Sequence, residues 1–125
     1  MKLLLDTHVL IWWLDDSPRL GQRARSAMAD GVNEVRVSAV SAGEMSLKAA
    51  RGKLRVPDDL ERQIADNSFE ELAFTIRHGA ALRDVPVHHG DPFDRMLVAQ
   101  AVCEGLTLVT ADRRLAEYDV PILLT

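Results

Sequence analysis

The segment KLLLDTHVLIWWL, residues 2–14, predicts a strand followed at once by a helix. Lys2 to Leu5 is a short apolar run typical of a buried strand, and it ends at Asp6. Thr7 is placed to cap a helix over His8 to Leu14. Because a strand that runs directly into a helix is the first half of a crossover to a parallel strand, this opening predicts an α/β domain.

The rest of the chain continues the alternation of strands and helices. The further predicted elements are a helix over 17–30 opened by Ser17 and Pro18, a strand over 35–39, helices over 41–52 and 58–66, a strand over 72–74, a helix over 76–83, a loop over 86–90, a helix over 91–104, a strand over 106–109, a short helix over 113–118 and a strand over 122–124. This order predicts a mainly parallel sheet with helices on both faces, a three-layer α/β/α sandwich. Residues 1–125 contain no repeat or linker, so we expect one domain.

Composition and charge narrow the possible functions. With 125 residues and 47% hydrophobic side chains, the chain has the size of one compact domain. No apolar run reaches the roughly 18 residues of a membrane span, and Asp6 interrupts the first apolar run, which argues against a signal peptide. The single cysteine, Cys103, is consistent with a reducing compartment, so we expect a cytoplasmic protein without membrane contact. The net charge of −4 means that a polyanion would have to be held locally.

Four acidic residues occupy equivalent places in the predicted fold. Asp6 and Asp112 follow strands directly, while Glu44 and Asp94 lie near the starts of helices. At the carboxyl edge of a parallel sheet these carboxylates would converge, and their mutual repulsion would be relieved by a divalent cation. Oxygen ligands, with no histidine or cysteine spacing typical of zinc, indicate Mg²⁺ or Mn²⁺. Asp6 is hard to explain as a helix cap, because Thr7 beside it could itself cap.

The other acids each have a structural explanation as well. Asp91 could be the N-cap of its helix, with Asp94 one turn further on near the positive end of the helix dipole. Ser41 and Glu44 have the spacing of a capping box, and Asp112 could cap the helix that follows it. For Asp91 the cap is the favoured interpretation, and for Asp94 it is the cation.

Four stretches resemble one known family. They are LLLDTHVLIWWL (3–14), SAVSAGEMSLKAARGKL (38–54), HHGDPFDRMLVAQA (88–101) and LTLVTADRRLAEY (106–118). In this order and spacing, over essentially the whole chain, the sequence resembles the PIN-domain ribonucleases, specifically the VapC-type toxins of bacterial toxin-antitoxin pairs. The resemblance implies a single PIN domain over residues 1–125 with the family's α/β/α sandwich.

The resemblance also implies a function and a set of site residues. It implies a Mg²⁺- or Mn²⁺-dependent endoribonuclease that hydrolyses RNA phosphodiester bonds. The family's metal-binding and catalytic acids fall on Asp6, Glu44, Asp94 and Asp112, and the residues expected to support these acids or the substrate are Thr7, Ser41, Thr110, Asp91 and Arg95. One departure is Gly43, where the family pattern leads us to expect a bulkier residue.

Partners follow from the same resemblance. It implies a homodimer and a cognate antitoxin that covers the acidic pocket. Trp12 and Trp13 point about 100° apart on a helix, so one of them could face a partner, although a helix buried on all sides is an equal alternative. Arg95, Arg113 and Arg114 could contact phosphates, or could form exposed ion pairs with neighbouring acids.

Two other classes of protein remain as alternatives. A receiver domain would also place acids and Mg²⁺ at a strand edge, but it needs a phosphoacceptor aspartate after a central strand and a lysine in a late loop, and neither is evident. A non-catalytic binding module would use the acids only as helix caps.

Overall fold

A parallel sheet of five strands lies at the centre of the protein, which the computed structural model describes over residues 1–88 and 90–125. The strands are β1 (Lys2–Leu5), β2 (Glu34–Ser38), β3 (Glu70–Leu72), β4 (Thr107–Thr110) and β5 (Ile122–Leu124). They lie in the order β3-β2-β1-β4-β5, and every neighbouring pair is parallel. The predicted parallel sheet is therefore confirmed.

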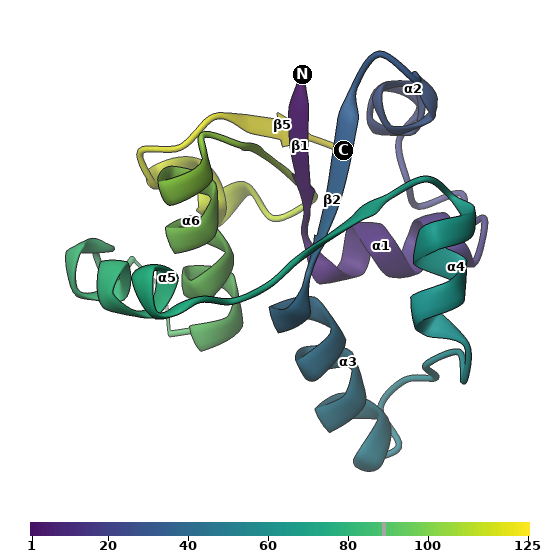
Figure 1. Cartoon of the computed structure of the whole chain (residues 1–125), viewed down its shortest axis with the longest axis horizontal. Helices are drawn as coiled ribbons and strands as arrows, with labels where there is room; N and C mark the ends of the chain where they lie inside the picture. The colour runs from purple at the N-terminus through teal and green to yellow at the C-terminus, as the bar shows by residue number, and fades with distance from the viewer. Residues whose placement is uncertain (89) are drawn as a thin grey trace.

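Helices cover both faces of this sheet (Figure 1). One layer contains α1 (Thr7–Leu14), α2 (Gln22–Ala29) and α4 (Leu60–Asp66), and the other contains α5 (Ile76–Ala81) and α6 (Pro92–Glu104). The helix α3 (Ala39–Ala50) follows β2 and contacts both α1 and α6, and two 3₁₀ helices, η1 (Leu82–Asp84) and η2 (Arg113–Glu117), complete the fold. These layers confirm the predicted α/β/α sandwich. In the part of the chain described, no helix is long and apolar enough to cross a membrane.

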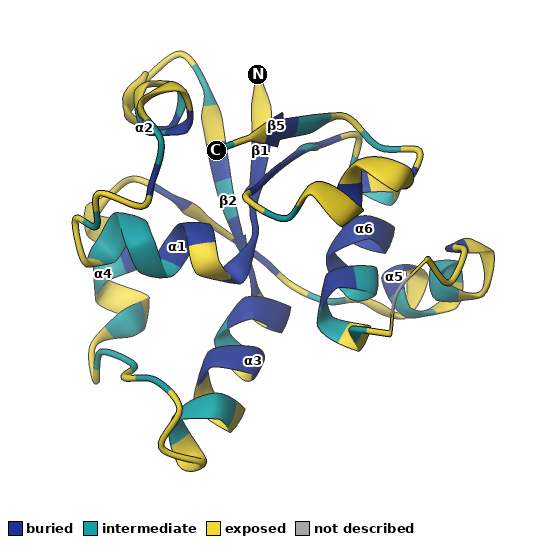
Figure 2. Ribbon diagram, turned by 180° about the vertical axis from the view of Figure 1, so that it is seen from behind, coloured by how far each residue is buried: buried dark blue, intermediate teal, exposed yellow. Residues whose placement is uncertain are grey.

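The strand β1 supplies side chains to a hydrophobic core on each face of the sheet. Leu3 and Leu5 pack with Leu10 of α1 on one face, and Leu4 packs with Leu97 of α6 on the other. All five side chains are fully buried, and Figure 2 shows the later part of β1 and turns of α6 in the colour of buried residues. Because burying one leucine contributes roughly 1.5–3 kcal/mol, the two cores fix the position of β1 and of the residues that follow it.

The helix α2 starts later than predicted. Ser17 and Pro18 lie in a turn, and the helix begins only at Gln22. Ser17 Oγ accepts a hydrogen bond from the Arg19 amide at 3.2 Å, and the Ser17 carbonyl accepts one from the Leu20 amide at 3.2 Å. A serine followed by a proline can begin a turn as well as a helix, and here Ser17 begins a turn.

Two predicted caps are wrong. Thr7 is the first residue of α1, and Asp6 occupies the N-cap position without a side-chain cap hydrogen bond. Ser41 lies inside α3, because that helix begins two residues earlier and is capped by Ser38, whose Oγ accepts a hydrogen bond from a first-turn amide at 2.9 Å. No capping box therefore forms at Ser41. Thr7 and Ser41 are free to face the interior.

The remaining boundaries agree with the predictions within a few residues. The helix predicted over 76–83 divides into α5 and η1, the strand predicted over 72–74 is β3 and lies two residues earlier, and α4 follows Asp59 where Asp58 was expected to open the helix. Both α6 and β5 have the predicted limits. The predicted loop 86–90 includes His89, which lies outside the described residues.

Candidate active site

Carboxylate side chains from distant parts of the chain line one pocket of about 250 Å³. The lining residues are Asp6, His8, Trp12, Glu44, Asp91, Asp94, Ala111, Asp112 and Arg114. The pocket lies beyond the carboxyl ends of β1 and β4, the two strands between which the strand order changes direction. Parallel α/β sheets open a crevice at such a point, because successive connections leave it on opposite sides. The structure thus brings together the four acids selected from the sequence, with Asp91 beside them.

Asp6 is held at the end of β1 by a hydroxyl group from β4. Thr110 Oγ1 donates a hydrogen bond to Asp6 Oδ2 at 2.6 Å and accepts one from the Asp112 amide at 3.0 Å. Asp6 is buried. Burial raises the pKa of its carboxyl group, with a smaller upward effect from Glu44, although the Thr110 hydrogen bond and His8 lower it. Thr110 therefore orients an acid that is costly to ionise.

Glu44 is buried on α3 with a partner on each carboxylate oxygen. Oε1 accepts a hydrogen bond from Thr7 Oγ1 at 2.7 Å, and Oε2 pairs with Lys48 Nζ at 2.5 Å. Thr7 Oγ1 also lies 3.0 Å from Ser41 Oγ, so both expected supporting hydroxyls adjoin this acid. The pKa of Lys48 is raised chiefly by its hydrogen bond with Glu44. At Gly43, a Cβ atom would meet nothing within 4 Å, so a Cβ would fit there without a clash.

Asp91 and Asp94 stand together at the start of α6. Asp91 Oδ1 accepts hydrogen bonds from the amides of Phe93 at 2.9 Å and Asp94 at 3.3 Å, which confirms the predicted cap. The Asp94 side chain is only 7% exposed. Its pKa is raised to about 7, chiefly by burial, with further contributions from the charges of Asp6, Asp91, Glu44 and Asp112 in that order. Repulsion from the other acids of the pocket therefore makes the Asp94 carboxyl group harder to ionise.

Asp112 serves as a cap and as a partner of an arginine. Its Oδ1 accepts a hydrogen bond from the Arg114 amide at 3.0 Å, and the Arg114 guanidinium lies 2.7 Å from Oδ2. Hydrogen bonding to Asp112 is the main cause of a raised pKa of Arg114. Capping therefore accounts for Asp91 and Asp112, whereas Asp6, Glu44 and Asp94 accept no cap hydrogen bond that the structure records.

The three arginines suggested as phosphate contacts separate in the structure. Arg114 lines the pocket and pairs with Asp112. Arg113 is exposed. Arg95 is not among the residues named in the pocket lining, and its Nη2 donates a hydrogen bond to the Val85 carbonyl at 2.9 Å, so its place beside the substrate stays a prediction. Its guanidinium fastens the end of η1 to α6.

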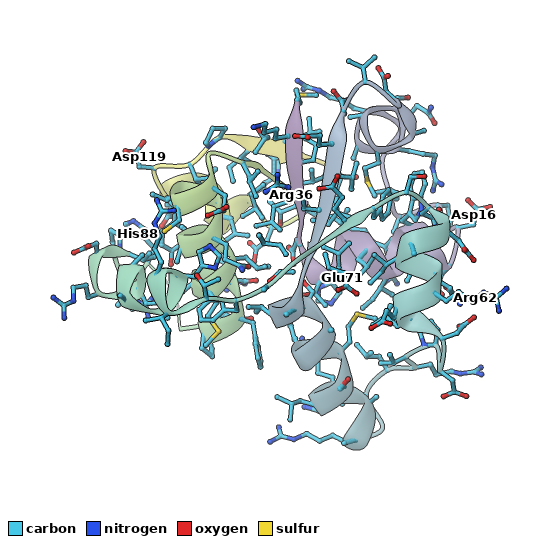
Figure 3. The ribbon with its side chains drawn as sticks, viewed as in Figure 1. Asp16, Arg36, Arg62, Glu71, His88 and Asp119 are labelled. Atoms are coloured by element: carbon cyan, nitrogen blue, oxygen red, sulfur yellow. The ribbon has the colours of Figure 1, made fainter. Side chains whose placement is uncertain are left out.

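Sequence reasoning missed three residues that contribute to the pocket. His8 and Trp12 line it from α1, and Lys48 pairs with Glu44. A signal was present in each case, because Lys48 follows Glu44, and Trp12 follows His8, by four residues, the spacing of neighbours on a helix face. The charged side chains of Asp16, Arg62 and Asp119 point outward at the periphery (Figure 3). The acids Asp6, Glu44 and Asp94 differ from them because they are buried.

The donor set fits a hard divalent cation. As the side chains stand, no three histidine, cysteine, aspartate or glutamate residues among those described lie close enough to hold a metal ion. Glu44 and Asp112 instead contact Lys48 and Arg114. The raised pKa values of Asp6 and Asp94 nevertheless show that the pocket would gain from added positive charge, and its carboxylate oxygens are the ligands that Mg²⁺ and Mn²⁺ prefer.

Comparison with known proteins gives the same picture. A family model described as PIN domain matches residues 3–121. Ribonuclease VapC22 of Mycobacterium tuberculosis H37Rv is 31% identical over 123 residues, covering 95% of this chain and 93% of the relative. In the crystal structure of VapBC2 from Rickettsia felis bound to a DNA fragment from their promoter, one chain matches with a TM-score of 0.73 and 14% identity, covering 100% of this chain and 99% of its own length. FitAcB from Neisseria gonorrhoeae matches with a TM-score of 0.63 and 20% identity, covering 97% and 96% of the two chains. The structural likeness confirms the predicted fold class.

Proposed function

The chain belongs to the PIN-domain family, and on that premise we propose that its acidic pocket is the active site of a metal-dependent endoribonuclease toxin of the VapC type. The observation that carries this proposal is the convergence of carboxylates around the buried Asp94, whose pKa reaches about 7. Perturbed acids in a cleft are typical of catalytic sites, and a relative with 31% identity is named a ribonuclease.

Asp6 and Asp94 are the proposed principal ligands of Mg²⁺ or Mn²⁺. These two carboxylates would hold the cation, which would supply positive charge beside the scissile phosphate and lower the pKa of a water molecule. Asp6 and Asp94 come from the end of β1 and the start of α6, and Thr110 keeps the Asp6 carboxylate in one orientation. Leu4 of β1 and Leu97 of α6 belong to the same hydrophobic core, and Asp6 and Asp94 line the same pocket.

Glu44 and Asp112 complete the proposed chemistry. Glu44 orients the attacking water and accepts its proton, while Thr7, supported by Ser41, holds the carboxylate toward the pocket. Asp112 would add a further carboxylate to the residues that hold the cation. Arg114, which lies at the pocket wall, donates hydrogen bonds to a phosphate oxygen of the RNA. With a net charge of −4, the chain holds RNA through this local arrangement.

The proposed biological setting is a toxin-antitoxin pair that acts in the cytoplasm. The whole chain, residues 1–125, forms one PIN domain, and a cognate antitoxin covers the acidic pocket. Half-buried apolar side chains beside α1, namely Ile11, Leu54, Val56 and Pro57, offer a surface for such a partner.

A homodimer is the expected assembly, and the hollow that α6 forms with Val85, where Val102 is 57% exposed, provides an apolar face for it.

Incubation of the purified protein with total cellular RNA tests the proposed activity. We expect discrete cleavage products with Mg²⁺ or Mn²⁺, none with EDTA, and none from the Asp94→Asn variant. Equal cleavage by both proteins would indicate a contaminating nuclease, and absence of cleavage by a folded, metal-loaded protein would argue for a binding module.

A further inference from the structure

One wall of the acidic pocket is aromatic. His8 and Trp12 both line the cavity that contains Asp6 and Asp94, and their ring centroids lie 6.1 Å apart with the planes tilted by 49°. The two residues are four apart on α1, so the helix itself sets their spacing. The pocket lining therefore combines carboxylates with two flat aromatic rings.

The two adjacent tryptophans serve different surfaces. Trp13 packs against Phe69 with ring centroids 5.6 Å apart, and its Nε1 donates a hydrogen bond to Asn67 Oδ1 at 3.0 Å. Trp12 is also half-buried against the core of the α1 layer, but the rest of its indole contributes to the acidic pocket. A ring held by the core in this way offers a preorganised surface, which reduces the entropy lost when a ligand packs on it.

We propose that Trp12, with His8 at its edge, forms the binding site for one unpaired nucleobase of the RNA, next to the phosphate at the carboxylates. This inference rests on the proposed ribonuclease function. A base is uncharged and has a flat face, so it can enter a negative pocket without the repulsion that a phosphate meets, and aromatic side chains stack on bases of any sequence. Lysine and arginine are the usual phosphate contacts. Among the residues that line the pocket, Arg114 is of this kind, and it comes from η2, whereas His8 and Trp12 come from α1.

The aromatic wall of the pocket favours single-stranded RNA. Bases within a duplex are covered on both faces by their neighbours, whereas unpaired bases are open to stacking on aromatic rings. Aromatic residues are common at protein interfaces too, but the cavity that Trp12 shares with Asp6 and Asp94 favours the substrate as its ligand.

Tryptophan fluorescence tests the contact directly, because the chain has two tryptophans. The Trp13→Phe/Asp94→Asn protein keeps Trp12 as its sole indole and does not cleave RNA. We expect short single-stranded RNA to quench this fluorescence saturably, and an abasic phosphodiester chain of the same length to leave it unchanged. The matched Trp12→Phe/Asp94→Asn protein, in which Trp13 reports, should show no quenching. Equal quenching of Trp12 by the RNA and by the abasic chain would overturn the proposal. So would an absence of quenching by RNA while fluorescence anisotropy of a labelled RNA shows saturated binding.

Kinetics provide a second readout in the active protein. Since stacking on an aromatic ring contributes roughly tenfold to a hundredfold in affinity per base, Trp12→Leu should raise KM by that order and change kcat less, and Trp12→Phe should restore most of the loss. Thermal unfolding and Mn²⁺ binding of each variant check that the fold and the acids are intact. If the parent protein cleaves RNA and Trp12→Leu has the same KM, the indole serves packing or a protein partner and this inference alone fails. If the parent protein neither binds Mn²⁺ nor cleaves RNA, the proposed function itself fails.

Discussion

Individual side chains divide the acidic pocket into two kinds of carboxylate. Glu44 and Asp112 each have a cationic neighbour, Lys48 and Arg114 respectively, which offsets part of their charge. Asp6 and Asp94 both have a raised pKa, for which burial is the largest cause. Added positive charge would therefore stabilise the protein most in the part of the pocket lined by Asp6 and Asp94.

The pKa of Asp94 predicts how stability depends on pH without divalent cations. Its folded-state pKa of about 7 lies above the ordinary value of 3.8, so the unfolded chain releases this proton at lower pH than the folded chain. The free energy of unfolding should then fall as the pH rises from about 4 to about 7, by up to about 4 kcal/mol. Urea unfolding in EDTA between pH 4 and pH 8 measures this loss. The burial of Asp6 adds to it in the same direction.

Asp94→Asn should flatten this pH dependence and stabilise the protein at pH 8 in EDTA, because the amide carries no charge. A matched control is Asp119→Asn, which removes an acid at the surface (Figure 3) and should retain the parent's slope. Saturating Mn²⁺ should restore stability to the parent protein at pH 8 but not to Asp94→Asn. The same pH slope in all three proteins would show that Asp94 is not the group whose pKa is raised.

At the scale of elements, the first turn of α3 joins the two sides of the site. Ser38 caps this helix by accepting a hydrogen bond from the Val40 amide, and its hydroxyl donates one to Gln100 Oε1 of α6 at 2.5 Å. Gln100 is fully buried, and its Nε2 donates a hydrogen bond to the Ala73 carbonyl at 3.2 Å. This junction fixes the helix that carries Glu44 against the helix that begins near Asp94.

Removal of the junction should therefore destabilise the fold. Ser38→Ala loses a helix cap and leaves the buried Gln100 oxygen without this donor, which together should lower the free energy of unfolding by about 2–3 kcal/mol. Ser46→Ala, an exposed change on the same helix, should alter it by no more than about 0.5 kcal/mol. Urea midpoints measure both. Equal effects of the two changes would mean that the Ser38 contact contributes nothing beyond helix propensity.

The same junction shows why element boundaries are harder to predict than elements. Apolar periodicity indicates the existence of α3 and α6, and the Asp91-Pro92 pair marks the start of α6 within one residue. Ser38 and Ser41 are both possible caps in sequence, and the one that caps in the structure, Ser38, also donates a hydrogen bond to Gln100, which lies 62 residues away. Ser17 and Pro18 are ambiguous for a similar reason, because only tertiary packing decides between a turn and a helix start.

At the scale of the whole molecule, the site is a product of topology. The strand order changes direction between β1 and β4, and Asp6 and Asp112 follow these two strands. The position of the acids at the carboxyl edge could be predicted from the sequence because parallel crossovers return each strand to the same edge. For Lys48, which pairs with Glu44, and for His8 and Trp12, which line the pocket, the spacing of four residues is too weak a signal, because many helix faces carry such pairs and only the folded chain shows which face meets the acids.

The central claim is that these carboxylates share a divalent cation, and anomalous X-ray diffraction from crystals soaked in Mn²⁺ measures this most directly. We predict an anomalous peak in the pocket within coordination distance of Asp6 and Asp94, with none at this position in Asp94→Asn crystals. A pocket without a peak at saturating Mn²⁺, in crystals of a protein that cleaves RNA, would contradict the account.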